Sequence, residues 1–257
     1  MKNNRLLLTL FTLFISTSFL TACQAAGGNN KSFFNTYIVQ YFIKTIHFVA
    51  GLFGGNFGLS IIVITILIRL ILMPLVLKQY KNQQAMKEKM DLLKPELDEI
   101  QKKLKSTKKP EEQQKLQQEM FALYRKHGVN PLSVGCLPII IQMPILLGFY
   151  YAIRGSKEIA THSFLWFNLG QPDLFMTAAA GIVYYLQFKV SQSNLPEAQQ
   201  NQMKYFGLLS PIMIVFVSLH APAVLPLYWT VGGLFLIMQT ILARKLYSTE
   251  KRRENSN

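Results

Sequence analysis

Arg69 is the residue whose chemistry most needs an explanation, because it lies inside the apolar run from Phe57 to Leu77. A charged side chain at the centre of a membrane helix costs about 2.5 to 3.5 kcal/mol on insertion scales. The thirteen aspartates and glutamates of the chain lie outside its apolar runs or, like Asp173, at the edge of one. We therefore expect Arg69 to face water, polar side chains or a carboxylate supplied by another molecule.

Uncharged polar residues in the other apolar runs are candidates for its surroundings. Helix rise places Arg69 about 13 Å and Gln142 about 18 Å from the same end of their runs, and Gln187 and Gln239 lie near that end too. The pattern predicts a hydrated groove that opens on one side only. Alternatively, the glutamines form hydrogen bonds between packed helices and have only a structural role. Trp229 is either an interfacial anchor or part of a surface along which an apolar segment slides.

The sequence carries no catalytic, cofactor-binding or metal-binding pattern. It contains no GxSxG, HExxH, Walker or CxxC motif, and its histidines fall near loops or run ends rather than on shared helix faces: His47, His127, His162 and His220. We therefore predict that the protein is not an enzyme, and that it has no catalytic residues, no cofactor and no metal.

Composition places the chain among integral membrane proteins. Half of its residues are hydrophobic and 16% are charged, with a mean hydropathy of +0.21. The net charge of +14 is compatible with nucleic-acid binding. In a membrane protein, however, basic residues more often mark cytoplasmic loops. We therefore expect no direct nucleic-acid function.

The apolar runs predict an all-α, five-helix membrane bundle. Thirteen lysines and arginines lie between Lys78 and Lys126, two between 189 and 204 and five from Arg244 onward, whereas the opposite loops hold four. The basic side is expected to be cytoplasmic, so the chain enters from outside and its C-terminus lies in the cytoplasm. The expected spans are residues 57–77, 130–153, 174–190, 205–220 and 224–243, joined by loops 154–173 and 191–204 and followed by the tail 244–257.

The N-terminal region predicts a lipid anchor. Residues 1–22 have the basic start and apolar centre of a signal peptide, and Leu20-Thr-Ala-Cys23 looks like a bacterial lipobox, so Cys23 is the expected lipidation site. Residues 23–56 are predicted to form an extracytoplasmic linker and an amphipathic helix, Ser32–Val49, on the outer membrane surface. Four glycines then predict a bend into the first span: Gly51, Gly54, Gly55 and Gly58.

Residues 78–129 predict a cytoplasmic antiparallel helical hairpin. Apolar residues spaced alternately by four and three form a seam, and a turn at Ser106–Pro110 separates the two arms. Pro95 predicts a kink in the first arm. The polar outer faces are either a solvated surface or a contact for lipid headgroups, a ribosome or a targeting partner. The seam residues are Met86, Met90, Leu93, Leu97, Ile100 and Leu104, then Leu116, Met120 and Leu123.

Three segments resemble the YidC membrane protein insertases. Tyr124-Arg-Lys-His-Gly-Val-Asn-Pro-Leu-Ser-Val-Gly-Cys-Leu-Pro-Ile-Ile-Ile-Gln-Met-Pro144 is similar to the entry into their second conserved span. Ile68-Arg-Leu70 with Met73-Pro74 resembles the first, and Leu227-Tyr-Trp-Thr230 with Gln239 resembles the last. The similarity runs in the same order from about residue 33 to 245. The lipobox and the small extracytoplasmic part resemble the Gram-positive branch.

The resemblance implies a multi-pass insertase and chaperone of the bacterial plasma membrane. Its clients would be nascent membrane proteins, and it would act in membrane lipid alone or with the Sec translocon, with the ribosome or signal recognition particle machinery as further partners. The resemblance also implies a substrate-contacting groove formed by Arg69, Gln142, Gln187, Trp229 and Gln239.

Two other functions compete with this expectation. In an anion transporter or channel, Arg69 would be the substrate site. Polar residues would then have to continue to the outer face of the membrane, and the outer halves of these apolar runs lack such residues. In a lipoprotein scaffold the hairpin would only recruit partners, which leaves the arginine unexplained.

Overall fold

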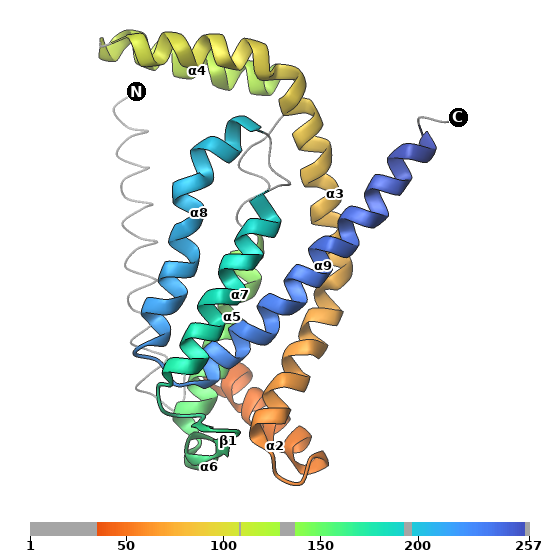
Figure 1. The fold of residues 1–257 in the computed structure, drawn as a ribbon, viewed down its shortest axis with the longest axis vertical. Helices are drawn as coiled ribbons and strands as arrows, with labels where there is room; N and C mark the ends of the chain where they lie inside the picture. Colours follow the sequence, from red (N-terminus) through yellow and green to blue (C-terminus); the bar gives the residue numbers. More distant parts are fainter. Residues whose placement is uncertain (1–34, 108, 129–136, 193–196, 255–257) are drawn as a thin grey trace.

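The computed structural model describes residues 35–107, 109–128, 137–192 and 197–254. These residues form mainly long helices that run along a common direction (Figure 1). The elements are η1 (Asn35–Val39), α2 (Gln40–Leu52), α3 (Phe57–Ser106), α4 (Pro110–Lys126), α5 (Leu137–Gly155), α6 (Lys157–Thr161), β1 (Ser163–Phe164), β2 (Phe167–Asn168), α7 (Leu174–Gln192), α8 (Glu197–Ser218) and α9 (Val224–Glu254).

The bundle is organised around α9, which packs against both α3 and α7, while α8 packs mainly on α7. α5 packs chiefly on η1, α2, α6 and α9. Within the described ranges two helical segments are long and apolar enough to cross a membrane: α3 and Val224–Tyr247 of α9. Gly207–Ser218 is a shorter apolar segment. A helical bundle is thus confirmed, and the five membrane spans stay a prediction.

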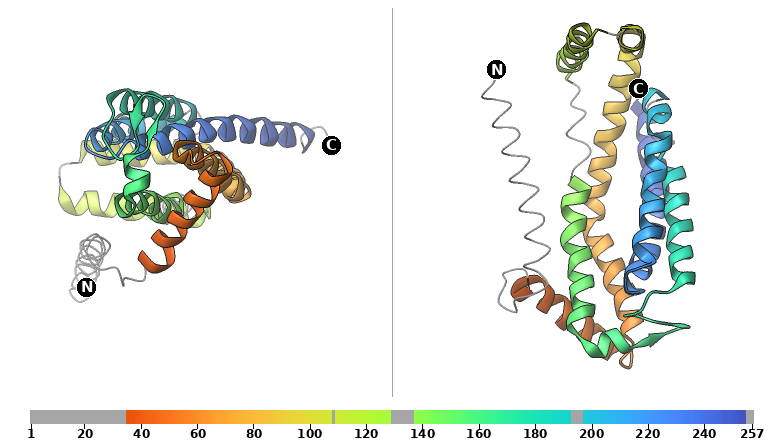
Figure 2. Two further views of the ribbon diagram at one scale, coloured as in Figure 1. Left: turned by 90° about the horizontal axis from the view of Figure 1, so that it is seen from below. Right: turned by 90° about the vertical axis from the view of Figure 1, so that its left-hand side faces the viewer.

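α3 continues through the residue at which the first span was expected to end. It runs unbroken from Phe57 to Ser106, with Pro74 and Pro95 inside it, and turns across one end of the bundle (Figures 1 and 2). Asn56 begins the helix, since its side-chain oxygen accepts a hydrogen bond of 3.0 Å from the Leu59 amide. The same helix therefore contributes both to the bundle and to the segment that extends beyond it.

α4 returns beside the far end of α3 (Figure 2). Pro110 at its first turn, followed by Glu111 and Glu112, suits a helix start. A separate small core joins the two helices, built from Met90, Leu93 and Leu97, with Met86, Met120, Leu123 and Tyr124 packed around it. Six of these seven residues belong to the apolar seam predicted from sequence, and Tyr124 is the exception.

The opposite end of the bundle holds α2, α6 and a two-stranded antiparallel sheet (Figure 1). Gly54 and Gly55 have φ values of 63° and 85°, which confirms the bend expected between α2 and α3. Gly58 serves a different purpose, because a Cβ atom there would overlap the Phe164 ring. Residues 32–34 of the predicted amphipathic helix lie outside the described residues, and so does the predicted lipidation site Cys23.

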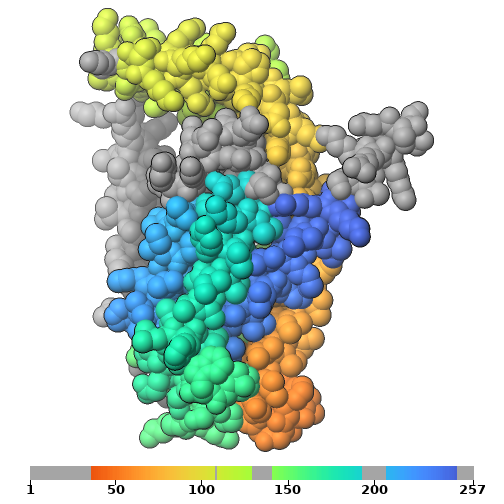
Figure 3. Space-filling view, viewed as in Figure 1, coloured from red at the N-terminus to blue at the C-terminus, as the bar shows by residue number. Residues whose placement is uncertain are grey.

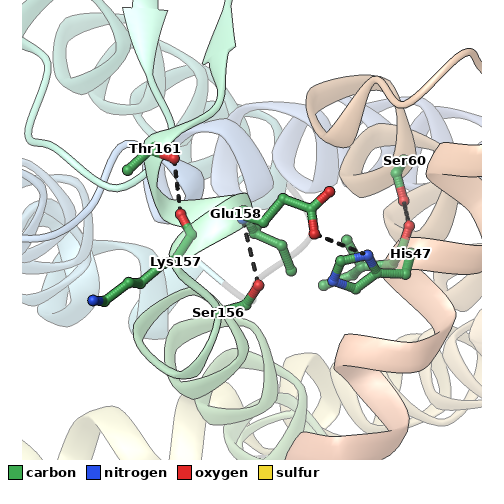
Figure 4. A network of polar contacts seen from close by, with 8 residues as sticks. His47, Ser60, Ser156, Lys157, Glu158 and Thr161 are labelled. Atoms are coloured by element: carbon green, nitrogen blue, oxygen red, sulfur yellow. Dashed lines mark hydrogen bonds and ion pairs between the residues drawn. The ribbon is translucent and has the colours of Figure 1, made fainter.

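Polar contacts join α2 to its neighbours (Figure 4). The Ser60 hydroxyl of α3 donates a buried hydrogen bond of 2.8 Å to the Ile46 carbonyl. His47 Nδ1 lies 3.8 Å from Glu158 Oε2 of α6. Because the first bond is buried and the second pair is solvent-exposed, the first contributes more to the placement of α2.

The main apolar core lies at this end of the bundle. It combines residues of α2, α3, α5, α7 and α9 with the segment from α6 to β2. Sequence patterns predicted a plain loop for 154–173, yet Ile159, Phe164, Phe167 and Leu169 of this segment are buried. Its secondary structure was missed because α6 has only five residues and each strand two, too few to repeat a helical or strand pattern.

Candidate functional site

Arg69 lies on the face of α3 that packs against α9, and its side chain is 9% exposed. Gly232 of α9 gives it room. A Cβ atom at Gly232 would stand 2.9 Å from Arg69 Nη2, closer than an ordinary van der Waals contact. The guanidinium therefore occupies the space that any larger residue at position 232 would fill.

The guanidinium heads a short chain of polar contacts between three helices. Arg69 Nη2 of α3 donates to Gln142 Oε1 of α5 at 3.5 Å, and Gln142 Nε2 donates to the Tyr228 hydroxyl of α9 at 2.6 Å. The Tyr228 ring also lies below the cation, 6.0 Å from Arg69 Cζ to the ring centroid. The contact to Gln142 is at the long limit for a hydrogen bond, so Arg69 is held less firmly than Gln142.

None of these partners carries a negative charge. Across the described parts of the chain, no aspartate or glutamate forms an ion pair with Arg69. Tyr228 is 1% exposed, so bulk water has little access to this side of the cation. A largely enclosed guanidinium with neutral partners keeps much of its capacity to attract an anion, because low local polarity strengthens electrostatic attraction.

The structure brings two of the predicted groove residues together, Arg69 and Gln142. Gln187 instead donates to Ser191 Oγ within α7, at 3.1 Å. Trp229 is 5% exposed and belongs to the apolar core. Among the described residues, these two side chains form no hydrogen bond with Arg69.

Gln239 is the most unusual of the predicted residues. It is 2% exposed, and neither its amide nitrogen nor its amide oxygen has a hydrogen-bond partner among the described residues. It lies seven residues after Gly232, two helical turns along the same face of α9. A buried amide without partners marks a place where water or the polar group of another molecule would be stabilised.

Tyr228 was missed by the sequence reasoning, which chose its neighbour Trp229. Successive helical residues point about 100° apart, so only one of this pair can face Arg69. The polar tip of tyrosine was the available signal, since a buried phenol usually finds a hydrogen-bond partner.

The described residues hold no cluster of three or more histidine, cysteine, aspartate or glutamate side chains suited to a metal ion. The polar cluster at Arg69 is built from a guanidinium, an amide and a phenol that binds the amide. It has the chemistry of a recognition site for acidic or polar groups.

Comparison with known proteins gives the family. The model of the family described as 60Kd inner membrane protein matches residues 48–251. The membrane protein insertase YidC 2 of Listeria monocytogenes is 54% identical over 89% of this chain and 83% of its own length. The membrane protein insertase MisCB of Bacillus subtilis is 45% identical over 92% of this chain and 89% of its own.

A solved structure agrees with these relatives. The crystal structure of an active YidC insertase with its first transmembrane domain resolved matches 79% of this chain at 27% identity, with a TM-score of 0.55. This chain spans 46% of the length of that one. The family model spans Arg69, Gln142 and Tyr228, the relatives and the solved structure point to the same family, and the chain belongs to the 60Kd inner membrane protein family, the family of the YidC membrane insertases.

Proposed function

We propose that this chain inserts other proteins into the bacterial plasma membrane, with Arg69 as the group that receives polar, acidic segments of the client. The observation that carries the proposal is the enclosed guanidinium whose described partners are all uncharged. An acidic client segment would supply the missing anion. Its attraction would lower the cost of bringing that segment to mid-bilayer depth, where charged groups are expensive.

Access to Arg69 requires a movement, since its side chain is 9% exposed. The contact to Gln142 is the weakest point of the cluster, at 3.5 Å. The described part of α5 packs mainly on η1, α2, α6 and α9, so this long hydrogen bond is a principal link from α5 to α3. We propose that a client separates α5 from α3 on the cytoplasmic side and opens a hydrated groove there.

The client's apolar helix would then leave the groove sideways into lipid. Burial of about twenty apolar residues in hydrocarbon drives this step, so the proposed cycle needs no nucleotide and no chemical turnover. Gln187, Gln239 and Trp229 are proposed as further contacts along the client's path. The five spans, the outside N-terminus lipidated at Cys23 and the cytoplasmic C-terminus form the proposed topology.

The proposed partners follow from that topology. Nascent membrane proteins are the clients, and the Sec translocon is a co-worker for some of them. The segment formed by the end of α3 with α4 would lie in the cytoplasm, where a ribosome or signal recognition particle machinery could reach it. Its exposed basic residues would suit either partner or the lipid headgroups.

Complementation tests the proposal. Cells depleted of their own insertase receive this chain with Arg69 unchanged, Arg69→Lys or Arg69→Ala, and membrane insertion is scored for clients whose translocated tails are acidic or neutral. Lysine should largely support the acidic tail, alanine should reduce its insertion severalfold, and neutral tails should depend less on the residue.

Arg154→Ala is the matched control. Arg154 also lies over a tyrosine ring, 5.3 Å from the Tyr150 centroid, but it is exposed at the other end of α5. Equal losses from Arg69→Ala and Arg154→Ala would refute a specific role for the enclosed cation, as would an equal loss for acidic and neutral tails.

A further inference from the structure

A second feature lies on a different face of α7 from the one that packs against α9. α7 and α8 lie side by side (Figure 3), and a shallow hollow of about 280 Å³ separates parts of their surfaces. Its lining is apolar except for one phenol. The lining residues are Gly181 and Tyr185 of α7 with Leu208, Pro211, Ile212 and Val215 of α8.

Local sequence shapes the surroundings of the hollow. At Gly181 the two helices approach closely, as shown by the 2.6 Å that would separate a Cβ atom there from Val215 Cγ2. Pro211 lies inside α8 and removes one backbone donor from that helix. The missing side chain at Gly181 makes room for Val215 of α8, so Gly181 and Val215 form a close contact beside the hollow.

A cation stands at one end of this hollow. Lys189 lies one turn beyond Tyr185, in the last turn of α7, and its Nζ is 5.6 Å from the Tyr185 ring centroid. Lys189 is exposed. The next residue, Val190, accepts a hydrogen bond from Arg244 of α9, so a second cation lies near the same end of α7.

This arrangement matches one chemical class of ligand. The lining extends over α8 from Leu208 to Val215, about 10 Å of helix, and Lys189 stands one helical turn, about 6 Å, beyond the lining residue Tyr185. An apolar hollow with an ammonium group just beyond it complements part of the acyl chain and the phosphate of an anionic lipid. In the proposed topology the cation lies at the cytoplasmic leaflet, whose anionic lipids attract basic residues.

We propose that the hollow between α7 and α8 binds an anionic glycerophospholipid of the cytoplasmic leaflet, with its phosphate at Lys189 and an acyl chain along Tyr185 and Gly181. The proposal rests on the orientation given above, but it does not depend on Arg69 or on client binding. It assigns the α7–α8 face to lipid, and so leaves the Arg69 face of the bundle to the client.

The chain contains a matched control for the charge. Lys81 of α3 also stands over a tyrosine, 5.7 Å from the Tyr247 ring centroid. Neither Lys81 nor Tyr247 lines the hollow. Lys81→Gln therefore removes the same charge and the same type of ring contact at a different place, and Lys189→Arg keeps the charge where the site needs it.

The test uses the full chain in vesicles of phosphatidylcholine and phosphatidylglycerol. Either lipid is supplied as a tracer with a photoreactive group in its acyl chain, and adducts are mapped by mass spectrometry. Phosphatidylglycerol adducts should concentrate on the lining residues, and Lys189→Gln should lower them about fivefold. Lys189→Arg and Lys81→Gln should leave them within twofold of the unchanged protein.

Three results would overturn the proposal: equal labelling by the two tracers at the hollow, unchanged labelling in Lys189→Gln, or an equal loss in Lys81→Gln. Circular dichroism of each variant verifies that the fold is retained, and Lys189→Arg supplies the comparison if Lys189→Gln is poorly folded. Loss of the Arg69 effect on client insertion would refute the proposed function while leaving this labelling pattern unchanged.

Discussion

Gln239→Met is a sharp test of the buried polar surface. Gln239 is 2% exposed, and both polar atoms of its amide lack a partner among the described residues. A buried polar group without hydrogen bonds costs about 1–3 kcal/mol. Methionine keeps a similar shape and a similar helix propensity, so the substitution removes mainly that cost. We expect the free energy of unfolding to rise by about 1–3 kcal/mol.

The assay is equilibrium unfolding of the purified chain in detergent, followed by circular dichroism. Gln187→Met is the control, since the Gln187 amide is half-buried and donates to Ser191. Its substitution should change stability by less than about 0.5 kcal/mol. A loss of stability in Gln239→Met would refute the reasoning, because it would mean that the amide is satisfied in the folded protein. Greater stability combined with weaker client insertion would identify Gln239 as a client contact.

Three further predictions concern the Arg69 cluster and the segment beyond the bundle. Tyr228→Phe leaves Gln142 Nε2 without its acceptor at 2.6 Å, so stability should fall by about 1–3 kcal/mol in denaturant unfolding; unchanged stability would show that water replaces the hydroxyl. Leu97 is 2% exposed, so Leu97→Ala should lower the free energy of unfolding by about 2–5 kcal/mol. Amide hydrogen exchange should become faster in α4 but not in α9, and equal acceleration in both helices would contradict a separate core. Burial raises the pKa of Tyr124 above its ordinary value of 10.0. The folded state therefore favours the neutral phenol, and its contribution to the free energy of unfolding should be complete below pH 10 and be lost as the pH rises through the raised pKa. Unfolding measured over this pH range should show that Tyr124→Phe abolishes the pH dependence due to this group.

The similar depth of Arg69 and Gln142 along their helices could be predicted from sequence, because each helical residue adds the same rise. Counting residues from the same ends of two apolar runs placed them at similar depth, and the structure joins them at 3.5 Å. Likewise, the apolar seam predicted the core of Met90, Leu93 and Leu97, since heptad spacing fixes which face of a helix is buried.

The rotation of α9 could not be predicted in the same way. An apolar helix surrounded by apolar neighbours has no polar face to set its orientation, so hydropathy does not show whether Tyr228 or Trp229 faces Arg69, and the phenol hydroxyl is the one local signal that favours Tyr228. Packing decides between them, with the guanidinium filling the place opposite Gly232. The contacts of Gln187 and Gln239 also depend on helix rotation: Gln187 bonds locally to Ser191, and Gln239 is buried with no hydrogen-bond partner in the part of the chain that the structure describes.

Helix lengths were also underestimated. Hydropathy marks where a run stops being apolar, but a helix continues wherever its residues tolerate the conformation. In α3, the span that begins at Phe57 and the predicted first arm of the hairpin form one unbroken helix to Ser106, and α9 extends to Glu254, well past its apolar run. α8 begins at Glu197, within the segment expected to be a loop. Polar helical extensions of this kind carry little hydropathy signal.

Crosslinking from position 142 is the most direct test of the central claim that Arg69 receives the client. A photoreactive residue replaces Gln142, which leaves Arg69 in place, and the chain is presented with a ribosome-bound client that has an acidic tail. Adducts should map to that tail and fall severalfold in Arg69→Ala, while position 154 should give few. Absence of tail adducts at 142, or equal adducts with and without Arg69, would contradict the account.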